Sequence, residues 1–404
     1  MRVLFTTTAG TGHLHPLVPL AQATVAAGHD VAVAGPRSVC PMIEASGLRA
    51  FPAGSDSHGD PEFGQVMAAI DRMTPGPEQA RRFLADVFCG LNTRRMVPDL
   101  LPLCREWRPD VIVRDSCEFG GAIVAERLGL PHAGVEVGLL IDLYAERAAI
   151  GAQLDRARQS VGLPPDPDLT MLYRYLDLSW TPPRFQDPAV SLPPTLHALR
   201  AAPFDRSGAE TLPDWVARLP ERPTVYATLG TEMNHVPGIF PHMLQTIIAG
   251  LRDEPLNVIV TVGRDCDPAA LGPRPLHVHV ERYIPQSLLL PQCDLVVTHG
   301  GHNTVLAAID AGLPLVVTPI TADQPENAGR CAALGLGRVV ALPALTPDAV
   351  REAVRAVLGD PAYRANVRRL RAEMDALPGP EHGVRLLEEL AAKKTPLYHK
   401  EKIA

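Results

Sequence analysis

The most constraining feature of this 404-residue chain is a pattern of short apolar runs and helical stretches that occurs twice. Residues 2–7 (RVLFTT) begin the first copy, and the similar run PTVYATLG at 223–230 begins the second. In both copies further apolar runs of strand length follow, separated by stretches of helical composition. Alternation of this kind predicts βαβ units and parallel sheets. We therefore predict an α/β protein made of two doubly wound, Rossmann-like domains.

A proline-rich segment, residues 181–222, separates the two copies. It lacks apolar periodicity, which predicts the end of a strand followed by a linker. We divide the chain into a first domain at 1–205, a linker at 206–222, a second domain at 223–378, a helix at 379–392 that packs back toward the first domain, and a tail at 393–404. Ligands of such sheets bind beyond the carboxyl ends of the strands, so we expect the domains to face each other across a cleft.

The composition limits the classes of function. The chain is 46% hydrophobic and 21% charged, and its net charge of -7 gives no basic surface for nucleic acid. No apolar run approaches the roughly 18 residues of a membrane-spanning helix, and the first residues contain no signal-like segment. The seven cysteines are scattered without a C-x-x-C pair, which argues against a disulfide framework or a zinc knuckle. We expect a cytoplasmic protein that does not insert into a membrane.

A histidine follows the first predicted strand. The stretch AGTGHLHP opens like a dinucleotide-binding fingerprint, but His15 replaces the third glycine, so the fingerprint fails. The glycine turn still delivers His13 just before a predicted helix, whose positive end disfavours the imidazolium and leaves His13 able to accept a proton. Asp115 ends another strand at the same sheet edge, where its carboxylate would fix the tautomer of His13. The alternatives are that His13 only caps the turn and that Asp115 caps the next helix.

The stretch THGGHN lies between an apolar strand and a helix. Backbone N–H groups in such a turn form an anion site, and Gly300 and Gly301 let a phosphate approach closely. His299 and the hydroxyl of Thr304 can donate to phosphate oxygens. A metal pair of His299 and His302 is the alternative, but no third ligand lies at a suitable spacing, so we predict no metal.

Polar residues in the same half of the chain suit the rest of a nucleotide sugar. Asp323 and Gln324 follow the next predicted strand and offer donors and acceptors for sugar hydroxyls. Tyr283 and Gln286 lie upstream and offer an aromatic face and an amide for a nucleobase. The base, the diphosphate and the sugar would thus bind in order along one edge of the second sheet.

Together these motifs resemble the two-domain GT-B glycosyltransferases, and more narrowly the inverting family-1 enzymes that glycosylate natural products. The resemblance is carried by YIPQ, HGGHNT and DQPENA in the second half, with GHLHP and RDS in the first. It implies that His13 is the general base, that Asp115 is its partner and that neither a cofactor nor a metal is needed. The nucleotide-sugar-binding residues that it implies are Thr231, Tyr283, Gln286, His299, Gly300, Gly301, Asn303, Thr304, Asp323 and Gln324.

One position departs from the family pattern. Members that use UDP-sugars commonly carry a glutamate that binds both ribose hydroxyls, and Ala307 stands at the matching position. The departure predicts a dTDP-linked donor, often a deoxysugar, whose sugar is transferred to a hydroxyl of a bulky polyketide or antibiotic aglycone. The alternatives are a UDP-sugar-dependent transferase, a GT-B sugar-nucleotide epimerase and a non-catalytic homologue that activates a partner enzyme.

Two irregular segments, 55–80 and 139–178, interrupt the first copy of the pattern, and we expect them to form the acceptor site. The candidate acceptor-binding residues are Phe63, Met67, Met73, Leu140 and Tyr144. The same side chains would equally suit the core of a lid. The predicted partners are a small-molecule aglycone and a nucleotide-sugar donor, without nucleic acid, and the sequence is compatible with a homodimer.

Overall fold

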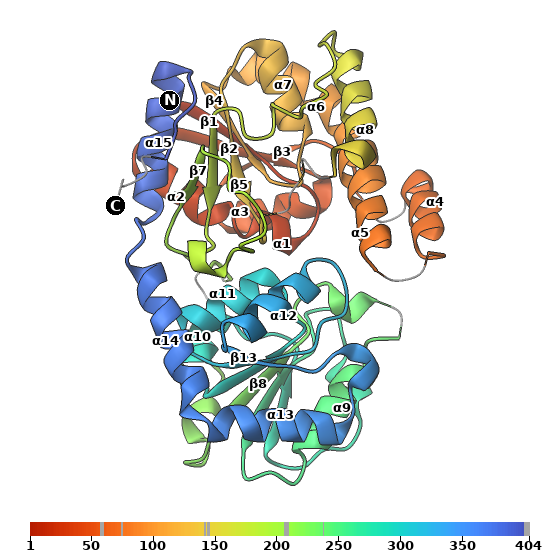
Figure 1. Cartoon of the computed structure of the whole chain (residues 1–404), viewed down its shortest axis with the longest axis vertical. Coiled ribbons are helices and arrows are strands. Elements are labelled where there is room, and N and C mark those ends of the chain that lie inside the picture. The colour runs from red at the N-terminus through yellow and green to blue at the C-terminus, as the bar shows by residue number, and fades with distance from the viewer. Residues whose placement is uncertain are drawn as a thin grey trace. The chain divides into compact units, whose positions relative to one another are not determined.

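The computed structural model describes residues 1–56, 60–73, 76–140, 143, 146–205, 210–236 and 238–399 of the chain. The chain forms two compact units. Unit 1 comprises Met1–Pro182, Pro188–Phe204 and Leu377–Ala404, and unit 2 comprises Pro183–Asp187 and Asp205–Ala376. Each unit contains one parallel sheet with helices on both faces (Figure 1). The predicted fold class, two Rossmann-like α/β domains, is confirmed.

Unit 1 is built on a seven-stranded parallel sheet in the order β3-β2-β1-β4-β5-β6-β7. Its strands are β1 (Arg2–Thr6), β2 (Asp30–Gly35), β3 (Arg49–Pro52), β4 (Val111–Asp115), β5 (His132–Glu136), β6 (Leu176–Ser179) and β7 (Leu196–Ala198). Every residue of β4 and β5 is buried, and in β1 and β2 only the first residue is exposed. Continuous apolar runs form such strands because helices cover both faces of the sheet.

The edge strand β7 differs from our expectation. It lies inside the segment 181–222, which we predicted to be a linker after the end of one strand, and it extends the sheet beyond β6. The strand has three residues and follows a proline pair, so it is too short to produce a periodic pattern. Proline has no N–H to donate. On the solvent side of an edge strand no neighbouring strand needs that donor, so no hydrogen bond between strands is lost.

The helices of unit 1 lie in two layers. They are α1 (Thr11–Leu14), α2 (Val18–Ala26), α3 (Cys40–Ala45), α4 (Pro61–Ile70), α5 (Pro77–Phe83), α6 (Thr93–Trp107), α7 (Gly120–Leu128), α8 (Arg147–Ser160) and α15 (Pro380–Lys393). A π-helical segment, η2 (Leu84–Asn92), joins α5 to α6. Helices α6, α7 and α8 share one hydrophobic core with the sheet, and α15 packs against α2. The close approach of α15 depends on Gly383, where a Cβ atom would lie 2.8 Å from Cδ1 of Leu20.

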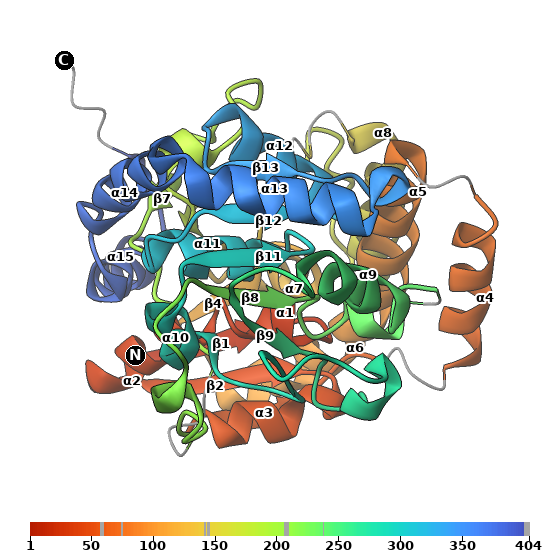
Figure 2. The same ribbon diagram turned by 90° about the horizontal axis from the view of Figure 1, so that it is seen from below.

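Unit 2 has a six-stranded parallel sheet in the order β10-β9-β8-β11-β12-β13, which is the Rossmann order. Its strands are β8 (Thr224–Thr228), β9 (Asn257–Thr261), β10 (Val278–Glu281), β11 (Leu295–Thr298), β12 (Leu315–Val317) and β13 (Gly337–Val339). Its helices are α9 (His242–Leu251), α10 (Gln286–Leu289), α11 (His302–Asp310), α12 (Gln324–Ala333), α13 (Pro347–Gly359) and α14 (Pro361–Asp375). Helices α9 and α13 pack together, and Figure 2 shows β9, β8, β11 and β12 side by side in this order.

The chain crosses from one unit to the other at more positions than we predicted. The sequence analysis assigned all of 1–205 to the first domain, whereas the short piece Pro183–Asp187 belongs to unit 2. The piece is anchored there by Phe185, whose side chain is fully buried, and by Arg330, which donates to the carbonyl of Phe185 over 3.0 Å. From Leu377 onward the chain belongs to unit 1 again, so α15 completes the unit in which the chain began.

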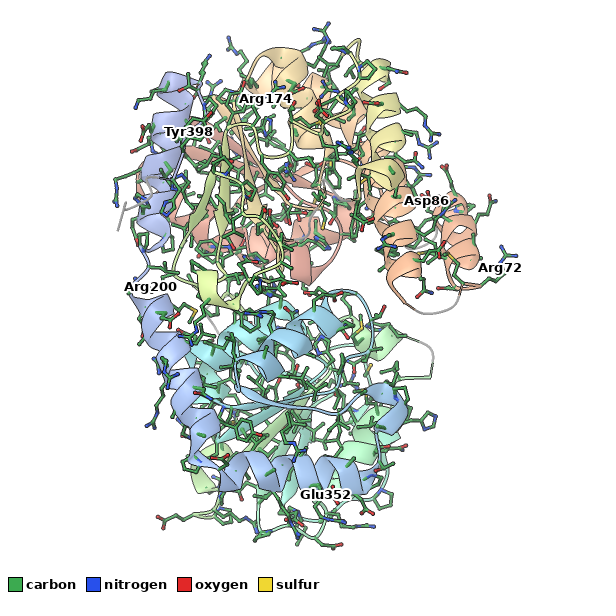
Figure 3. The ribbon with its side chains drawn as sticks, viewed as in Figure 1. Arg72, Asp86, Arg174, Arg200, Glu352 and Tyr398 are labelled. Atoms are coloured by element: carbon green, nitrogen blue, oxygen red, sulfur yellow. The ribbon has the colours of Figure 1, made fainter. Side chains whose placement is uncertain are left out.

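Charged side chains such as Arg72 and Glu352 are exposed at the surface of their units (Figure 3). Within the described residues, no helix combines the length and apolar character needed to cross a membrane.

Candidate active site

The first site lies where β1 and β4 end side by side in unit 1. The strand order reverses at this pair, and ligands of doubly wound sheets bind at such a switch point. The turn after β1 contains Gly10, whose φ of 108° favours glycine, and it leads into the short helix α1. His13 in α1 thereby meets Asp115, the last residue of β4, and Nδ1 of His13 lies 3.4 Å from Oδ1 of Asp115.

The carboxylate of Asp115 is fully buried and surrounded by donors. Its Oδ2 accepts the backbone N–H of Thr8 over 2.8 Å, and its Oδ1 accepts that of Cys117 over 2.7 Å. Burial alone would raise the pKa of Asp115, but the charge and hydrogen bond of His13 and the two backbone donors outweigh it and lower the pKa below its usual range. Asp115 is therefore ionised at neutral pH and orients the His13 ring through Nδ1.

Two local expectations in this region differ from the structure. His13 lies inside the four-residue helix α1 and not just before a helix, which differs from its predicted position. Asp115 does not cap α7, which begins five residues later, at Gly120. The N–H groups at the start of α7 are instead met by Glu118, whose carboxylate accepts that of Gly120 over 2.6 Å and that of Gly121 over 2.9 Å.

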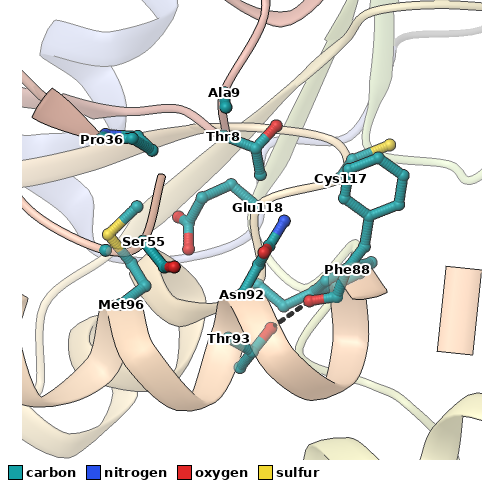
Figure 4. A pocket seen from close by; sticks show the side chains of 12 residues that line it. Thr8, Ala9, Pro36, Ser55, Phe88, Asn92, Thr93, Met96, Cys117 and Glu118 are labelled. Atoms are coloured by element: carbon teal, nitrogen blue, oxygen red, sulfur yellow. Dashed lines mark hydrogen bonds between the residues drawn. The ribbon is translucent and has the colours of Figure 1, made fainter. Parts of the chain in front are cut away.

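A recess of about 250 Å³ adjoins this pair (Figure 4). Its lining residues are Thr8, Ala9, Pro36, Gly54, Ser55, Phe88, Asn92, Thr93, Met96, Cys117, Glu118 and Phe119. The centroid of the Phe88 ring lies 5.3 Å from that of His13. Phe88 and Asn92 come from the π-helical segment η2, where the hydroxyl of Thr93 donates to the Phe88 carbonyl over 2.7 Å. The recess thus combines apolar walls with hydroxyl and amide groups close to His13.

The sequence analysis did not identify Phe88 or Asn92, because a π-helical turn has no periodic signature distinct from that of the helices around it. The predicted acceptor-binding residues do not line this recess. Leu140 is 4% exposed and belongs to the hydrophobic core. Phe63 and Met67 are half-buried on α4, and Met73 is half-buried after it. Tyr144 lies outside the described residues.

Three side chains in the described part of the chain have the spacing of a metal site. One ligand atom each from His13, Asp115 and Cys117 lies within 4.8 Å of the other two. Nitrogen, oxygen and sulfur together would suit zinc better than magnesium. Burial and Asp115 raise the pKa of the Cys117 thiol well above its usual range, so a cation would have to displace its proton.

The second site lies at the corresponding switch point of unit 2, where β8 and β11 end side by side. His299 follows β11, and its ring lies between two glycines. A Cβ atom on Gly230, after β8, would lie 2.7 Å from Cε1 of His299, and one on Gly301 would lie 2.4 Å from Nε2. Any larger residue at either position would displace the ring.

Burial determines the charge of His299. The residue is 7% exposed, and burial lowers its pKa to about 4. Its ring is therefore neutral at pH 7 and has one N–H, and the backbone carbonyl of Thr228 is a hydrogen-bond partner of the ring. An anionic ligand would have to compete with this carbonyl for the N–H, and the role of His299 at a phosphate stays a prediction.

The turn between β11 and α11 presents backbone donors. Gly300 has a φ of 90°, and its N–H is accepted by the hydroxyl of Thr298 over 3.1 Å. Gly301 is the N-cap of α11, which makes no side-chain cap hydrogen bond. The start of this nine-residue helix therefore carries the positive end of the helix dipole without a capping side chain, which favours an anionic ligand.

Asn327 connects this turn to the next one. Its Nδ2 donates to the carbonyl of Gly300 and to Oδ2 of Asp323, both over 2.9 Å. Its Oδ1 lies 3.1 Å from Nδ1 of His302, which is buried. The asparagine thus fixes Asp323 relative to the glycine turn. Asn327 belongs to the motif DQPENA, but we predicted no role for it from the sequence.

Other predicted donor-site residues also lie around this turn. Gln324 is buried, and its Oε1 accepts the N–H of Ile320 over 2.9 Å, so this oxygen shapes the loop and leaves only the amide nitrogen for a sugar. Gln286 donates to the hydroxyl of Thr304 over 3.3 Å. Thr231 and Asn303 are exposed.

Tyr283 has a neighbour that the sequence did not indicate. The guanidinium of Arg264 lies over its ring, 3.6 Å from the centroid, and its hydroxyl donates to the carbonyl of Asp205. Burial and Asp205 raise the pKa of Tyr283 to about 12. One ring face is thus occupied by a cation. A nucleobase that stacks there would have to use the other face or displace Arg264, a residue that the sequence analysis did not single out.

Comparisons with known proteins identify the family of the chain. The family model described as "Erythromycin biosynthesis protein CIII-like" matches the chain with its N-terminal domain over residues 22–230 and with its C-terminal domain over 247–390. The chain is a glycosyltransferase of this family. It transfers a sugar to an aglycone.

Named relatives match the glycosyltransferase along its whole length. The 10-deoxymethynolide desosaminyltransferase of Streptomyces venezuelae is 31% identical, over 97% of this chain and 98% of its own. The tylactone mycaminosyltransferase of Streptomyces fradiae is 30% identical, over 97% of this chain and 93% of its own. The crystal structure of the glycosyltransferase VinC in complex with dTDP is 28% identical, covers 97% of this chain and 100% of its own, and superimposes with a TM-score of 0.80.

Proposed function

We propose that this glycosyltransferase transfers a deoxysugar from a dTDP-sugar to a hydroxyl of a polyketide or antibiotic aglycone, with inversion at the anomeric carbon and with His13 as general base. The observation that carries the proposal is the pairing of His13 with the ionised Asp115 at a sheet switch point, beside a recess with polar and apolar walls. A base in this setting accepts a proton on Nε2 while Asp115 stabilises the imidazolium.

Two observations support dTDP as the nucleotide. VinC is a relative whose structure was determined with dTDP, and relatives of the glycosyltransferase are named for the transfer of amino deoxysugars. In this chain Ala307 is 7% exposed in α11 and has no carboxylate with which to bind a ribose 2′-hydroxyl. The deoxyribose of dTDP lacks the 2′-hydroxyl, so no hydroxyl of the donor is left without a partner at Ala307.

The proposed reaction is one displacement. His13 takes the proton from the acceptor hydroxyl, the oxygen forms a bond to the anomeric carbon, and the bond from that carbon to the diphosphate breaks. The charge that develops on the leaving diphosphate is met by the positive end of the α11 dipole and by the N–H of His299, which would exchange the Thr228 carbonyl for a phosphate oxygen. These donors can replace a metal ion, so we propose that the reaction needs neither a metal nor a cofactor.

Replacement of His13 by Ala tests the base. We expect the turnover to fall by about 10² to 10⁴-fold, which is the usual contribution of a general base. Binding of dTDP, measured by calorimetric titration, is expected to stay within a factor of two, because His13 belongs to unit 1 and the diphosphate donors to unit 2. His15→Ala, which removes a second histidine from the same turn, is the matched control. Turnover of the His13 variant at the wild-type rate would exclude His13 as the base.

Titration of the wild-type protein with dTDP and with UDP, in a buffer that contains a chelator, tests the donor. We expect dTDP to bind at least tenfold more tightly, a difference of about 1.4 kcal/mol. Tighter binding of UDP would contradict the assignment based on Ala307. Analysis of the anomeric configuration of the product by NMR then tests inversion.

A further inference from the structure

Behind Asp115, a buried arginine connects the end of β4 to the strands beside it. Arg114 precedes Asp115 in β4, and its side chain is 0% exposed, the largest of the fully buried side chains. Its guanidinium donates to the carbonyls of Asp115 and Ser116 over 3.2 and 3.0 Å, and to that of Leu172 over 2.9 Å. The planar guanidinium therefore holds the two peptide groups that follow Asp115 and Ser116.

The parallel register explains why an arginine fits there. Arg114 in β4 is level with Gly134 in β5, and Gly134 is level with Asp177 in β6. A Cβ atom on Gly134 would lie 2.1 Å from Oδ1 of Asp177 and 3.6 Å from a terminal nitrogen of Arg114. Because Gly134 has no side chain, the side chains of Arg114 and Asp177 can approach each other across β5.

A second acid, Glu136, completes the cluster. Among the described residues, Oε1 of Glu136 and both carboxyl oxygens of Asp177 are buried without a hydrogen-bond partner. Burial and the neighbouring Glu136 raise the pKa of Asp177 well above its usual range. Burial also raises the pKa of Glu136, so both acids beside Arg114 resist ionisation.

The positive charge of Arg114 also acts on several titratable side chains around it. The titratable groups that surround it are Asp115, Cys117 and Glu118 from the segment after β4, His132 and Glu136 from β5, Asp177 from β6 and Cys89 from η2. For the three acids Glu118, Glu136 and Asp177, its positive charge lowers the pKa. A buried positive charge next to the catalytic carboxylate favours the ionised form of that carboxylate.

We propose that Arg114 is a positioning residue for the reaction: its guanidinium fixes the chain that carries Asp115, the partner of His13, and its charge lies beside that residue. The inference rests on the proposed function, in which His13 is the base. Position and charge are two separate contributions, and substitutions of Arg114 can separate them. A lysine keeps the charge but cannot reproduce the fork of donors to three carbonyls. A methionine has similar length and removes both.

The test compares Arg114→Lys, Arg114→Met and Asp177→Asn in the full-length protein, with dTDP-glucose as donor and a fluorescent hydroxycoumarin as acceptor. For Arg114→Lys we expect kcat to fall about tenfold, with KM for the donor and the acid limb of the kcat/KM pH profile unchanged. For Arg114→Met we expect a fall of about a hundredfold and an acid limb that moves up by about one pH unit, because Asp115 becomes harder to ionise.

Asp177→Asn is the matched control, because it changes a residue of the same cluster with the same burial and shape. Because both carboxyl oxygens of Asp177 lack a hydrogen-bond partner among the described residues and so do not hold the chain at Asp115, we expect both kcat and the acid limb to stay as in the wild type. A shift of the acid limb in this variant equal to that in Arg114→Met would overturn the assignment of the effect to Arg114. Titration with dTDP and near-UV circular dichroism report on the folding of each variant.

The outcomes separate this inference from the proposed function. If His13→Ala were as active as the wild type, the proposed function would be wrong whatever the Arg114 variants did. If His13→Ala were inactive while both Arg114 variants kept the wild-type kcat and acid limb, only the positioning role would be wrong. If both Arg114 variants failed to fold, the cluster would serve stability alone, and the inference would be overturned.

Discussion

At the scale of single residues, Gly230 and Gly301 determine where His299 can lie. Gly301 has a φ of -58°, which an alanine adopts without strain, so Gly301→Ala changes only the space beside the ring. We expect binding of dTDP, measured by calorimetric titration, to weaken by about tenfold or more, because the displaced His299 can no longer donate to the diphosphate. Gly329→Ala in α12 is the control, since a Cβ atom there meets nothing within 4 Å. Equal affinity in both variants would mean that His299 does not contact the diphosphate.

The sequence predicts residues of this kind when they follow a strand directly. His13, Asp115, His299 and Gly300 could be assigned because parallel strands bring their carboxyl ends to one edge of a sheet. Arg114 could not, because its role depends on the register of three strands and on the missing side chain at Gly134. The cation over the Tyr283 ring was missed for the same reason, since Arg264 lies 19 residues away in the sequence and meets it only in the folded sheet.

At the scale of elements, α7 begins beside a carboxyl group that titrates in an unusual range. Burial raises the pKa of Glu118 to about 7, and its hydrogen bond with Thr6, 2.5 Å between Oγ1 and Oε2, only partly offsets this. From its ordinary value of 4.5 up to about 7, the folded state holds a proton that the unfolded state has released. The free energy of unfolding therefore falls as the pH rises through this window, by roughly 3 kcal/mol for this group.

Glu118→Gln tests this contribution. We expect the variant to lose that part of the pH dependence, so that its free energy of unfolding falls less between pH 5 and pH 7 than that of the wild type. Urea unfolding at the two pH values, followed by circular dichroism, measures the difference. Glu44→Gln on the exposed side of α3 is the control and should keep the wild-type slope. If Glu118→Gln kept it too, the raised pKa of Glu118 would be wrong.

The elements themselves were predicted unevenly. Apolar strands such as β1 and β8 were found at nearly their observed bounds, because continuous burial gives a continuous apolar run. The short edge strand β7 and the π-helical turns of η2 were missed, since each is determined by hydrogen bonds that local composition does not encode. The recess residues Phe88 and Asn92 come from η2, which explains why the acceptor side was predicted less well than the donor side.

At the scale of the whole molecule, the last helix of the chain completes the first unit. Helix α15 buries Val384, Leu386, Leu387 and Leu390, and it packs against α2. Each such side chain contributes about 1.5–3 kcal/mol on burial, and the total is comparable to the 5–15 kcal/mol that stabilises a typical domain. Unit 1 therefore depends on a segment that the ribosome makes after unit 2.

A chain that ends at Leu377 should consequently lose unit 1 and keep unit 2. We expect limited proteolysis of this truncated protein to degrade unit 1 rapidly and to leave a resistant fragment of unit 2 that still binds dTDP. The control is a chain that ends at His399, which retains α15 and the backbone hydrogen bond from Leu397 to Tyr175. It should resist proteolysis like the full-length protein. Survival of unit 1 without α15 would show that α2 and the sheet need no cover from the carboxyl-terminal helix, and loss of both units would show that they do not fold independently.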